Sequence, residues 1–473
     1  MKKFLSLALA AIMLLALLAG CGGNNSTSNP DSGTPGSSDT PGTSDASGQT
    51  ETITIEYWNS AEGAMATSTE YLVNQFNETV GKEKGIFVNS IFQGGDVVEK
   101  LKTLVQANDY KNFPDVGQIY AAGLSTVLQM ENLVTLDSIY SSGEYEISLK
   151  KEDIYDNFLR SYTYEGQLIS LPLNASTMLM YYNKDAAREA GLNPDAPPAT
   201  IAELAEWTDK LTVREGDTVT RYGLNLQMDR YELVNFLSAV SDTGCNYIGD
   251  NGGGRDAMIT KLTIGEDGSL MTFLNEWEKI VATGGYKAVN DDERGEFANG
   301  LSAINFQSSA QLAAMTSNAE GKFELGVAAL PACSTSYNAG AAVGGGSVAM
   351  FDKGDAARRQ AAWEFMQFMA SPESQMYLFE NNGYLPVCKS AYETDAYKEF
   401  IAGNPNAAVA VEQLNHSDPG MQEPMDLINW ELNTLCKENF IAWTAGEITK
   451  QECHDNIVDT FNAKLTEYIR ANG

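Results

Sequence analysis

Residues 164–192 read YEGQLISLPLNASTMLMYYNKDAAREAGL, and this stretch decides the expected fold. A turn at Gly166 leads into an apolar run, which Pro172 and the polar residues 174–177 interrupt before a second apolar strand at 178–182. A chain that leaves one packed layer, crosses an extended polar segment and enters another suits the hinge of a two-lobed protein, because a few extended residues absorb the backbone rotation of closure. The alternative interpretation is a single kinked strand.

The N-terminal 50 residues predict export and a lipid anchor. Residues 1–20 carry two lysines, an apolar run and small residues, which are the three parts of a signal peptide. The end of this segment, LAGC (18–21), resembles the bacterial lipobox, in which Cys21 is diacylated and becomes the mature N-terminus. The alternative is an ordinary signal peptide followed by a chance cysteine. Residues 21–50 are almost all small and polar, so we expect a flexible tether that holds the protein at the outer face of a bacterial cell membrane.

The length of the chain indicates how many lobes it forms, and its net charge argues against some classes of partner. The folded part of about 420 residues is too long for one core and suits two lobes. The chain has 31 Lys and Arg against 63 Asp and Glu, a formal net charge of −32, which argues against nucleic acid and anionic lipid surfaces as partners.

The cysteines and histidines indicate no cofactor and no metal site. Six cysteines stand at 21, 245, 333, 388, 436 and 453, and the five that remain after lipidation of Cys21 cannot all pair. We expect buried thiols, with one disulfide left open. No CxxC spacing is present, and the chain has only two histidines.

Strand and helix patterns alternate from residue 53 onward, as in an α/β fold. Thr200 and Glu203 predict a capping box at the start of a helix. The Gly-rich segment 250–255 lacks phosphate-loop spacing, so we interpret it as an ordinary surface loop. Three glycines in AAVGGGSVAMF (341–351) indicate close approach of this backbone to another group.

Eight motifs in a fixed order carry a resemblance to a known family. They are YWNSAEG (57–63), FPDV (113–116), GQLISLPLNASTMLMYYNKD (166–185), FANGLSAI (297–304), GVAALP (326–331), GGGS (344–347), AAWEFMQFMASPE (361–373) and GYLPV (383–387). In this order they resemble the extracellular solute-binding proteins of carbohydrate ABC importers. The resemblance covers nearly all of the chain after residue 50.

This resemblance implies an α/β, two-lobed periplasmic-binding-protein-like fold of type II, with a ligand cleft between lobes that crossover hinge segments join. It implies a monomer that binds a carbohydrate and delivers it to the permease subunits of an importer. We expect an N-terminal lobe made of 51–173 and 307–352, and a C-terminal lobe made of 174–306 and 353–473.

Four ligand-binding positions follow from the resemblance to the glycerol-3-phosphate-binding members of this family. They match Ser176 in NAST, Ser308 or its neighbour Ser309, Gly345 in the glycine run and Tyr384 in GYLPV. All lie where the sequence predicts a crossing or a close approach. The resemblance therefore implies that these groups face the ligand.

Three positions depart from that pattern and change the expected ligand. Asp96 and Ala121 stand where those members have a tyrosine and a glutamate, and Leu432 falls near their arginine. An anion needs charge-assisted donors, and this chain has no arginine between Arg359 and Arg470. We therefore expect a neutral, polyhydroxylated ligand whose hydroxyl groups Asp96 would bind.

Aromatic side chains would stack against the C–H face of a sugar, and the candidates are Trp58, Tyr120 and Tyr384. The first two have an alternative interpretation as core aromatics. Asp96 has an alternative role as the N-cap of the helix that starts at Val97. Arg230 is the one candidate that would restore an anion site, and its alternative is a solvated surface role.

Other functions stay open beside the binding protein, which we do not expect to be an enzyme. A surface-anchored glycoside hydrolase needs only two carboxylates, but the sequence has no nucleophile elbow, no HExxH and no metal-ligand spacing. A binder of glycerol-3-phosphate or of a glycerophosphodiester is a second alternative. A third is a sensor that presents its ligand to a signalling partner.

Overall fold

The structure is a computed structural model of the 473-residue chain, and it describes residues 52–95, 97–237, 248–289, 292–333 and 340–472. The expected signal peptide, Cys21 and the tether lie outside these residues, as do Asp96 and Cys245. The expectations for those positions stay predictions. Among the described residues, we find no helix with both the length and the apolar composition needed to pass through a bilayer.

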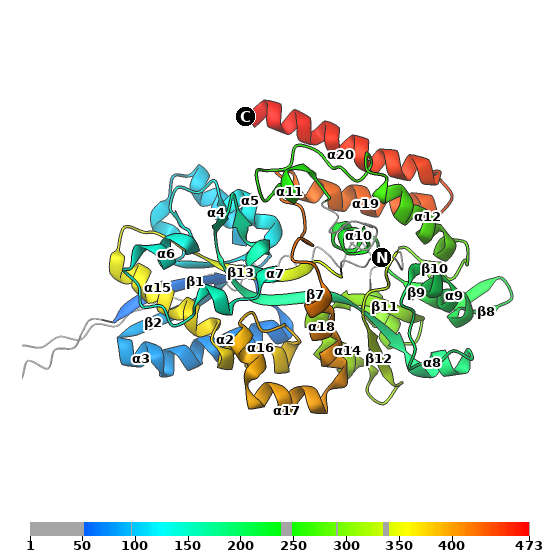
Figure 1. Cartoon of the computed structure of the whole chain (residues 1–473), viewed down its shortest axis with the longest axis horizontal. Helices are drawn as coiled ribbons and strands as arrows, with labels where there is room; N and C mark the ends of the chain where they lie inside the picture. Colours follow the sequence, from blue (N-terminus) through cyan, green and yellow to red (C-terminus); the bar gives the residue numbers. More distant parts are fainter. Residues whose placement is uncertain (1–51, 96, 238–247, 290–291, 334–339, 473) are drawn as a thin grey trace, which may run out of the picture. The chain divides into compact units, whose positions relative to one another are not determined.

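One sheet runs through the described chain (Figure 1). Its principal strands are β1 (Ile53–Asn59), β2 (Ile86–Phe92), β3 (Val116–Tyr120), β7 (Leu171–Asn183), β9 (Thr218–Asn225), β10 (Tyr286–Lys287), β11 (Ser302–Ser308) and β13 (Val343–Phe351). Their hydrogen-bonded order is β10-β9-β11-β7-β13-β3-β1-β2. We call the part β13-β3-β1-β2, with its helices, the first lobe and the part β10-β9-β11, with its helices, the second lobe. Strand β7 belongs to both.

Helices lie on both sides of this sheet in Figure 1. This alternation with the strands is the predicted α/β pattern. The helices used below are α2 (Gly63–Glu78), α4 (Val97–Gln106), α7 (Asp156–Ser161), α10 (Arg230–Leu237), α15 (Ala356–Met369), α18 (Pro405–His416), α19 (Asn429–Thr444) and α20 (Lys450–Asn472).

Strand β7 joins the two lobes as one continuous, fully buried strand of 13 residues. Its first part, 171–177, pairs with β13, and its second part, 178–182, pairs with β11. The predicted crossing is therefore present, but the predicted interruption at 174–177 is wrong. Proline cannot donate to a strand ladder, and the register between the two strands shifts at this point. Gly346 pairs with Asn174 and Ser347 pairs with Pro172, which leaves Leu173 of β7 as the extra, bulged residue next to the proline.

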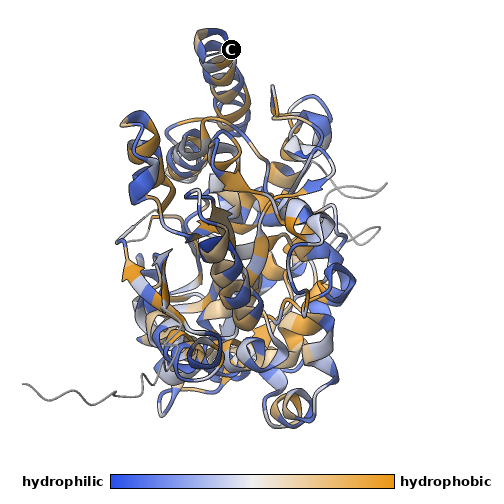
Figure 2. Ribbon diagram, turned by 90° about the vertical axis from the view of Figure 1, so that its left-hand side faces the viewer, coloured by the Kyte–Doolittle hydropathy of each residue, from blue (hydrophilic) through white to orange (hydrophobic). Residues whose placement is uncertain are grey.

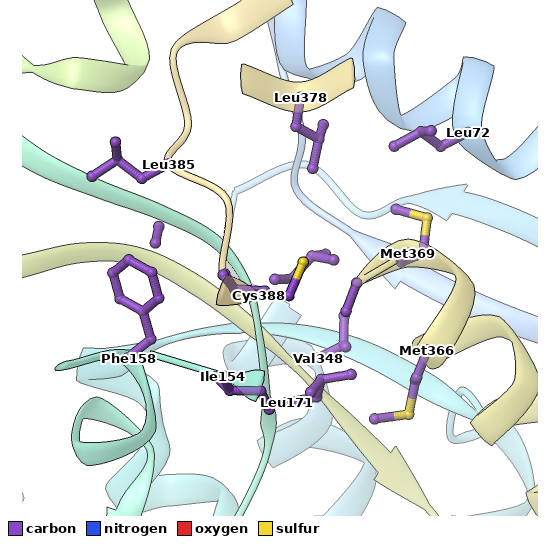
Figure 3. Close-up of a cluster of buried hydrophobic side chains, with 14 of the residues drawn as sticks. Leu72, Ile154, Phe158, Leu171, Val348, Met366, Met369, Leu378, Leu385 and Cys388 are labelled. Atoms are coloured by element: carbon purple, nitrogen blue, oxygen red, sulfur yellow. The ribbon is translucent and has the colours of Figure 1, made fainter. Parts of the chain in front are cut away.

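Buried side chains on β7 and β13 alternate between the two faces of the sheet, as the period of two requires. Leu179 and Val348 join a first core on one face (Figure 3), whereas Met180 joins a second core and Ala349 a third cluster on the other face. The first core is continuous across both lobes. On the opposite face the second core belongs to the second lobe and the third cluster to the first lobe, so the apolar packing divides there. Figure 2 shows apolar residues concentrated in the strands.

Helix α15 packs on the first lobe. The ring centroids of Phe365 and Tyr57 lie 5.2 Å apart, and those of Phe365 and Phe76 lie 5.3 Å apart. We expected residues 353–473 in the C-terminal lobe. Helix α15 lies within this range but packs on the first lobe. The predicted lobe bounds as a whole stay a prediction.

Helices α19 and α20 form an antiparallel pair that closes the second core. The Asn456 side chain donates to Asn439 over 2.8 Å, which sets the register of this pair. At 1.5 Å per residue, this register offsets Cys436 from Cys453 by about 9 Å along the helix axes, too far for a disulfide. Both thiols are buried and free, as are those of Cys333 and Cys388, the other two cysteines of the described residues.

The glycine-rich segment 250–255 is buried only in its second half, residues 253–255, whereas Asn251 is exposed. Its interpretation as an ordinary surface loop is therefore wrong for residues 253–255. Arg255 is only 4% exposed. Its guanidinium donates to the carbonyl oxygens of Arg160 in α7, Gly253 and Glu423, over 3.0–3.1 Å. Burial lowers the pKa of Arg255. Arg255 therefore ties α7 to the segment that leads into α19.

Candidate ligand-binding cleft

A cavity of about 550 Å³ lies between the two lobes. The first lobe contributes α4 and the end of β3, and the second lobe contributes the start of α10 and the start of α19. Its lining residues are Val98, Glu99, Lys102, Tyr120, Ala122, Gly123, Thr126, Asp229, Arg230, Tyr231, Glu423, Leu427, Ile428, Trp430, Glu431 and Asn433. The cavity thus occupies the place where the third cluster and the second core separate.

The strands β7 and β13 come together beside this cavity. By the alternation along β7, Asn174 and Ser176 lie on the same face as Met178 and Met180, which is the face that carries the second core. Ser176 pairs with Gly344 of β13. Both Asn174 and Ser176 are buried, at 1% and 4% exposure, so polar groups are held here inside the molecule.

The glycine run of β13 allows this close contact. A Cβ on Gly344 would lie 2.8 Å from the hydroxyl oxygen of Tyr231 and 3.0 Å from that of Ser176. A Cβ on Gly346 would lie 3.1 Å from the Asn174 amide oxygen. The predicted close approach of this backbone to other groups is confirmed. These residues, Asn174, Ser176 and Gly344–Gly346, contact Tyr231 in the cavity wall and do not themselves line the cavity. We call them the floor of the cleft.

Tyr384 joins the same group. Leu385 next to it donates its backbone N–H to the Ala175 carbonyl over 2.7 Å, which fixes the turn against β7. Burial raises the pKa of Tyr384, the neighbouring Tyr120 raises it further, and the Asn174 side chain lowers it. The bond between Leu385 and Ala175 places Tyr384 next to the part of β7 that carries Asn174 and Ser176.

The structure thus brings together five of the eight predicted residues. Tyr120 and Arg230 line the cavity, and Ser176, Gly345 and Tyr384 lie at or beside the floor. Their roles in binding stay predictions.

Of the other three residues, Trp58 and Ser308 do not line the cavity, and Asp96 is not described by the structure. Trp58 packs against the third cluster, where its indole nitrogen is buried without a hydrogen-bond partner. Ser308 accepts from the Ala310 N–H over 3.2 Å and so caps a short turn, while Ser309 accepts from the Thr177 N–H over 3.3 Å. Asp96 lies outside the described residues, so its predicted roles as a ligand residue and as an N-cap stay predictions.

Arg230 has no surface role, and that alternative is wrong, because the residue is only 5% exposed. Its Nε lies 3.3 Å from a Glu423 carboxylate oxygen, and its Nη1 lies 3.5 Å from one of Asp426. Its Nη2 donates to the Pro424 carbonyl over 2.6 Å. The guanidinium therefore has two carboxylate partners from the segment before α19.

The remaining charges around the cavity are also paired. Lys102 lies 2.6 Å from Glu99, and Glu431 pairs with Lys464 of α20. Asp229 accepts from the Tyr231 N–H over 2.7 Å. Within the described ranges, no three His, Cys, Asp or Glu side chains form a group suited to a metal ion.

Sequence reasoning missed two aromatic residues of the cavity. Tyr231 directly follows the predicted Arg230, and its neighbours in the sequence do not distinguish it from a core tyrosine. Trp430 is 69% exposed. No other large apolar residue of the described chain is more exposed. Its exposure at the start of a helix has no sequence signal, because a tryptophan in such a pattern is usually buried.

A comparison with protein families matches this chain to the model of the bacterial extracellular solute-binding proteins over residues 71–406. The match spans most of the described chain. The chain belongs to the bacterial extracellular solute-binding proteins. The family predicted from the eight motifs is thereby confirmed.

Relatives of this solute-binding protein have related sequences and folds. The sn-glycerol-3-phosphate-binding periplasmic protein UgpB of Pectobacterium atrosepticum is 27% identical over 425 residues, which cover 88% of this chain and 91% of the relative. The structure of UgpB from Mycobacterium tuberculosis in complex with glycerophosphocholine has a TM-score of 0.70 at 24% identity, with 88% of this chain and 99% of that one covered.

A sugar-binding structure is almost as similar. The cyclic alpha-maltosyl-1,6-maltose binding protein from Arthrobacter globiformis has a TM-score of 0.69 at 19% identity, with 88% and 99% of the two chains covered. These likenesses confirm the predicted two-lobed α/β fold of the solute-binding protein.

Proposed function

We propose that this chain is the substrate-binding component of an ABC importer, held at the outer face of a bacterial membrane by a lipid on Cys21. It captures a neutral carbohydrate in the cleft between its lobes and delivers it to membrane permease subunits. The observation that supports a neutral ligand is the pairing of Arg230 with Glu423 and Asp426. Both cations that line the described part of the cavity, Lys102 and Arg230, have carboxylate partners. Arg230 is the buried one, so an anion bound by Arg230 would have to displace a carboxylate.

The aromatic lining supports a sugar. Tyr120 is 40% exposed on the first lobe and Trp430 is 69% exposed on the second, and both line the cavity. A pyranose has one face of C–H groups that packs on such rings, while its hydroxyl groups need polar partners such as Asn174, Ser176 and Tyr384. The cavity volume of about 550 Å³ lies within the usual range for a small-molecule site.

The placement of the cavity supports binding by closure. Its walls come from two lobes that share β7 and the continuous first core, while the packing on the cavity side is divided between the third cluster and the second core. A rotation about the shared strand changes the distance between Tyr120 and Trp430 and leaves each packed cluster intact. We propose binding without catalysis. Incubation of the protein with oligosaccharides should therefore yield no hydrolysis product.

The relatives favour a second candidate, a ligand that carries a glycerol phosphate group. UgpB of Pectobacterium atrosepticum binds sn-glycerol-3-phosphate by its name, and the Mycobacterium tuberculosis UgpB structure holds glycerophosphocholine. For this chain, that candidate requires Arg230 to exchange a buried carboxylate for a ligand phosphate. The acidic partners make the exchange unfavourable, because burial strengthens the existing ion pairs.

A thermal-shift screen of the mature chain tests the choice. Neutral mono- and oligosaccharides and sn-glycerol-3-phosphate are added separately, and a ligand at a hundred times its Kd should stabilise the protein by about 2.7 kcal/mol. We expect at least one neutral sugar to raise Tm and glycerol-3-phosphate to leave it unchanged. A shift with glycerol-3-phosphate and with no neutral sugar would overturn the proposal.

A further inference from the structure

The ion pair between Arg230 and Glu423 forms part of the cavity wall. Both residues line the cavity, and the Arg230 Nε to Glu423 Oε2 distance is 3.3 Å. The Arg230 side chain is 6% exposed and the Glu423 side chain 17%. A ligand in the cavity would therefore meet the carboxylate and the guanidinium together, at one point of the wall.

Glu423 is held at this point by its own backbone. Arg255 donates to the Glu423 carbonyl over 3.0 Å, and Arg230 donates to the carbonyl of the next residue, Pro424, over 2.6 Å. The segment is also attached to the first lobe, because Gln422 donates to the Asn157 carbonyl in α7 over 2.9 Å. The carboxylate thus has a fixed position against Arg230.

The second carboxylate partner of Arg230 has a different environment. Asp426 is fully buried, is absent from the cavity lining and accepts from the Ile428 N–H over 2.8 Å. A ligand cannot replace Asp426 without unfolding its surroundings. Glu423 is the partner whose place a ligand anion could take.

We propose that Glu423 sets the charge of the ligand, because its carboxylate acts as a built-in anion that occupies Arg230 and excludes ligand phosphates and carboxylates. This inference rests on the proposed function, since it explains how an arginine in the cleft is compatible with a neutral ligand. It assigns specificity to a residue that contacts the arginine and the cavity. Removal of the Glu423 charge should convert Arg230 into an anion site.

The test compares Glu423→Gln with the unchanged protein, by calorimetric titration of the mature chain with sn-glycerol-3-phosphate. Glycerol is the matched neutral probe, because it lacks only the phosphate. A charged hydrogen bond to the guanidinium predicts that Glu423→Gln gains roughly tenfold or more in affinity for glycerol-3-phosphate. The affinity for glycerol should not change.

Two further variants separate the mechanism from a general change of charge. Glu431→Gln removes one negative charge from the same cavity wall but leaves Arg230 paired, because Glu431 pairs with Lys464. We expect no gain of anion affinity in Glu431→Gln. Adding Arg230→Gln to Glu423→Gln should abolish the gain. An equal gain in Glu431→Gln, or a gain that survives the loss of Arg230, would refute the inference.

A pH titration of the unchanged protein keeps the inference testable if Glu423→Gln folds poorly. Sulfate is the probe, because its charge is constant between pH 5 and pH 8. Burial raises the pKa of Glu423, while Arg230 and Arg255 lower it, and Asp229 and Asp426 are the other charged groups that face it. Protonation of Glu423 should increase sulfate affinity as the pH falls, and an affinity that stays constant contradicts the inference.

The outcomes distinguish this inference from the proposed function. A protein that no neutral sugar stabilises, but whose Glu423→Gln variant gains glycerol-3-phosphate affinity through Arg230, contradicts only the proposed ligand. A protein that binds a neutral sugar, but whose folded Glu423→Gln variant gains no anion affinity, contradicts only the role of Glu423.

Discussion

A Cβ atom on Gly345 would lie 1.8 Å from the carbonyl oxygen of Asn174. Gly345 also has a φ of 104°, in the region that side chains other than glycine rarely adopt. The contact between β13 and β7 at the floor of the cleft therefore depends on the absence of a side chain at this position.

Gly345→Ala should destabilise the protein by about 3 kcal/mol, from backbone strain and from the clash together. Gly354→Ala is the matched control, because Gly354 has a φ of 80° but no atom within 4 Å of its Cβ position. Urea unfolding of both variants measures the difference. If the two variants lose equal stability, the close contact with Asn174 contributes nothing.

Trp430→Ala should weaken carbohydrate binding about tenfold, since an aromatic contact contributes about 1 kcal/mol beyond its buried area. Stability should change by less than about 0.5 kcal/mol, because the side chain is 69% exposed. Tyr468→Ala removes an exposed aromatic outside the cavity lining and should leave the affinity unchanged. Titration with the sugar found in the screen provides the measurement, and equal affinities in the two variants would remove Trp430 from the site.

Arg255→Met should destabilise the protein by about 3 kcal/mol or more, because three carbonyl groups, one of them fully buried, lose their donor. Arg214→Met is the control, since Arg214 is exposed and donates to the single carbonyl of Thr283. Thermal and urea unfolding compare the two. If Arg255→Met loses as little stability as the control, other contacts hold α7 and the segment before α19 together.

Glu232→Gln should stabilise the protein above neutral pH. Burial raises the pKa of Glu232, as does its hydrogen bond with Asp229, and one carboxylate oxygen is buried without a partner. A carboxyl whose folded pKa is raised contributes stability below its ordinary pKa of about 4.3, and this contribution is lost as the pH rises through the folded pKa.

Between pH 5 and pH 8, the Tm of the unchanged protein should therefore fall by more than the Tm of Glu232→Gln. Glu320→Gln, an exposed substitution, should follow the unchanged protein. Parallel pH profiles for all three proteins would show that Glu232 ionises as an exposed glutamate does.

Features that depend on neighbouring residues were predictable from the sequence. The capping box of Thr200 and Glu203 is present, because both partners lie within one helical turn. The glycine run predicted a close approach, because only a missing side chain explains three glycines in a buried strand. The crossing between the lobes at 171–183 was predicted from Pro172 and the polar residues 174–177, although these residues do not interrupt the strand.

Features that depend on distant residues were not predictable. Nothing in the local sequence of Arg230 indicates that Glu423, nearly 200 positions later, lies 3.3 Å away, so its alternative role at the surface was wrong. The buried place of Arg255 depends in the same way on carbonyl groups from two distant segments, at Arg160 and Glu423. Pro172 suggested an interruption of the strand, because the local sequence does not show that pairing with β13 continues across the proline, with Leu173 as the extra residue.

A crystal structure of the mature chain with the sugar found in the screen tests the central claim most directly. The account predicts a neutral sugar between Tyr120 and Trp430, with Arg230 still paired to Glu423. A structure in which Glu423 has moved away and an anionic group of the ligand contacts Arg230 would contradict it.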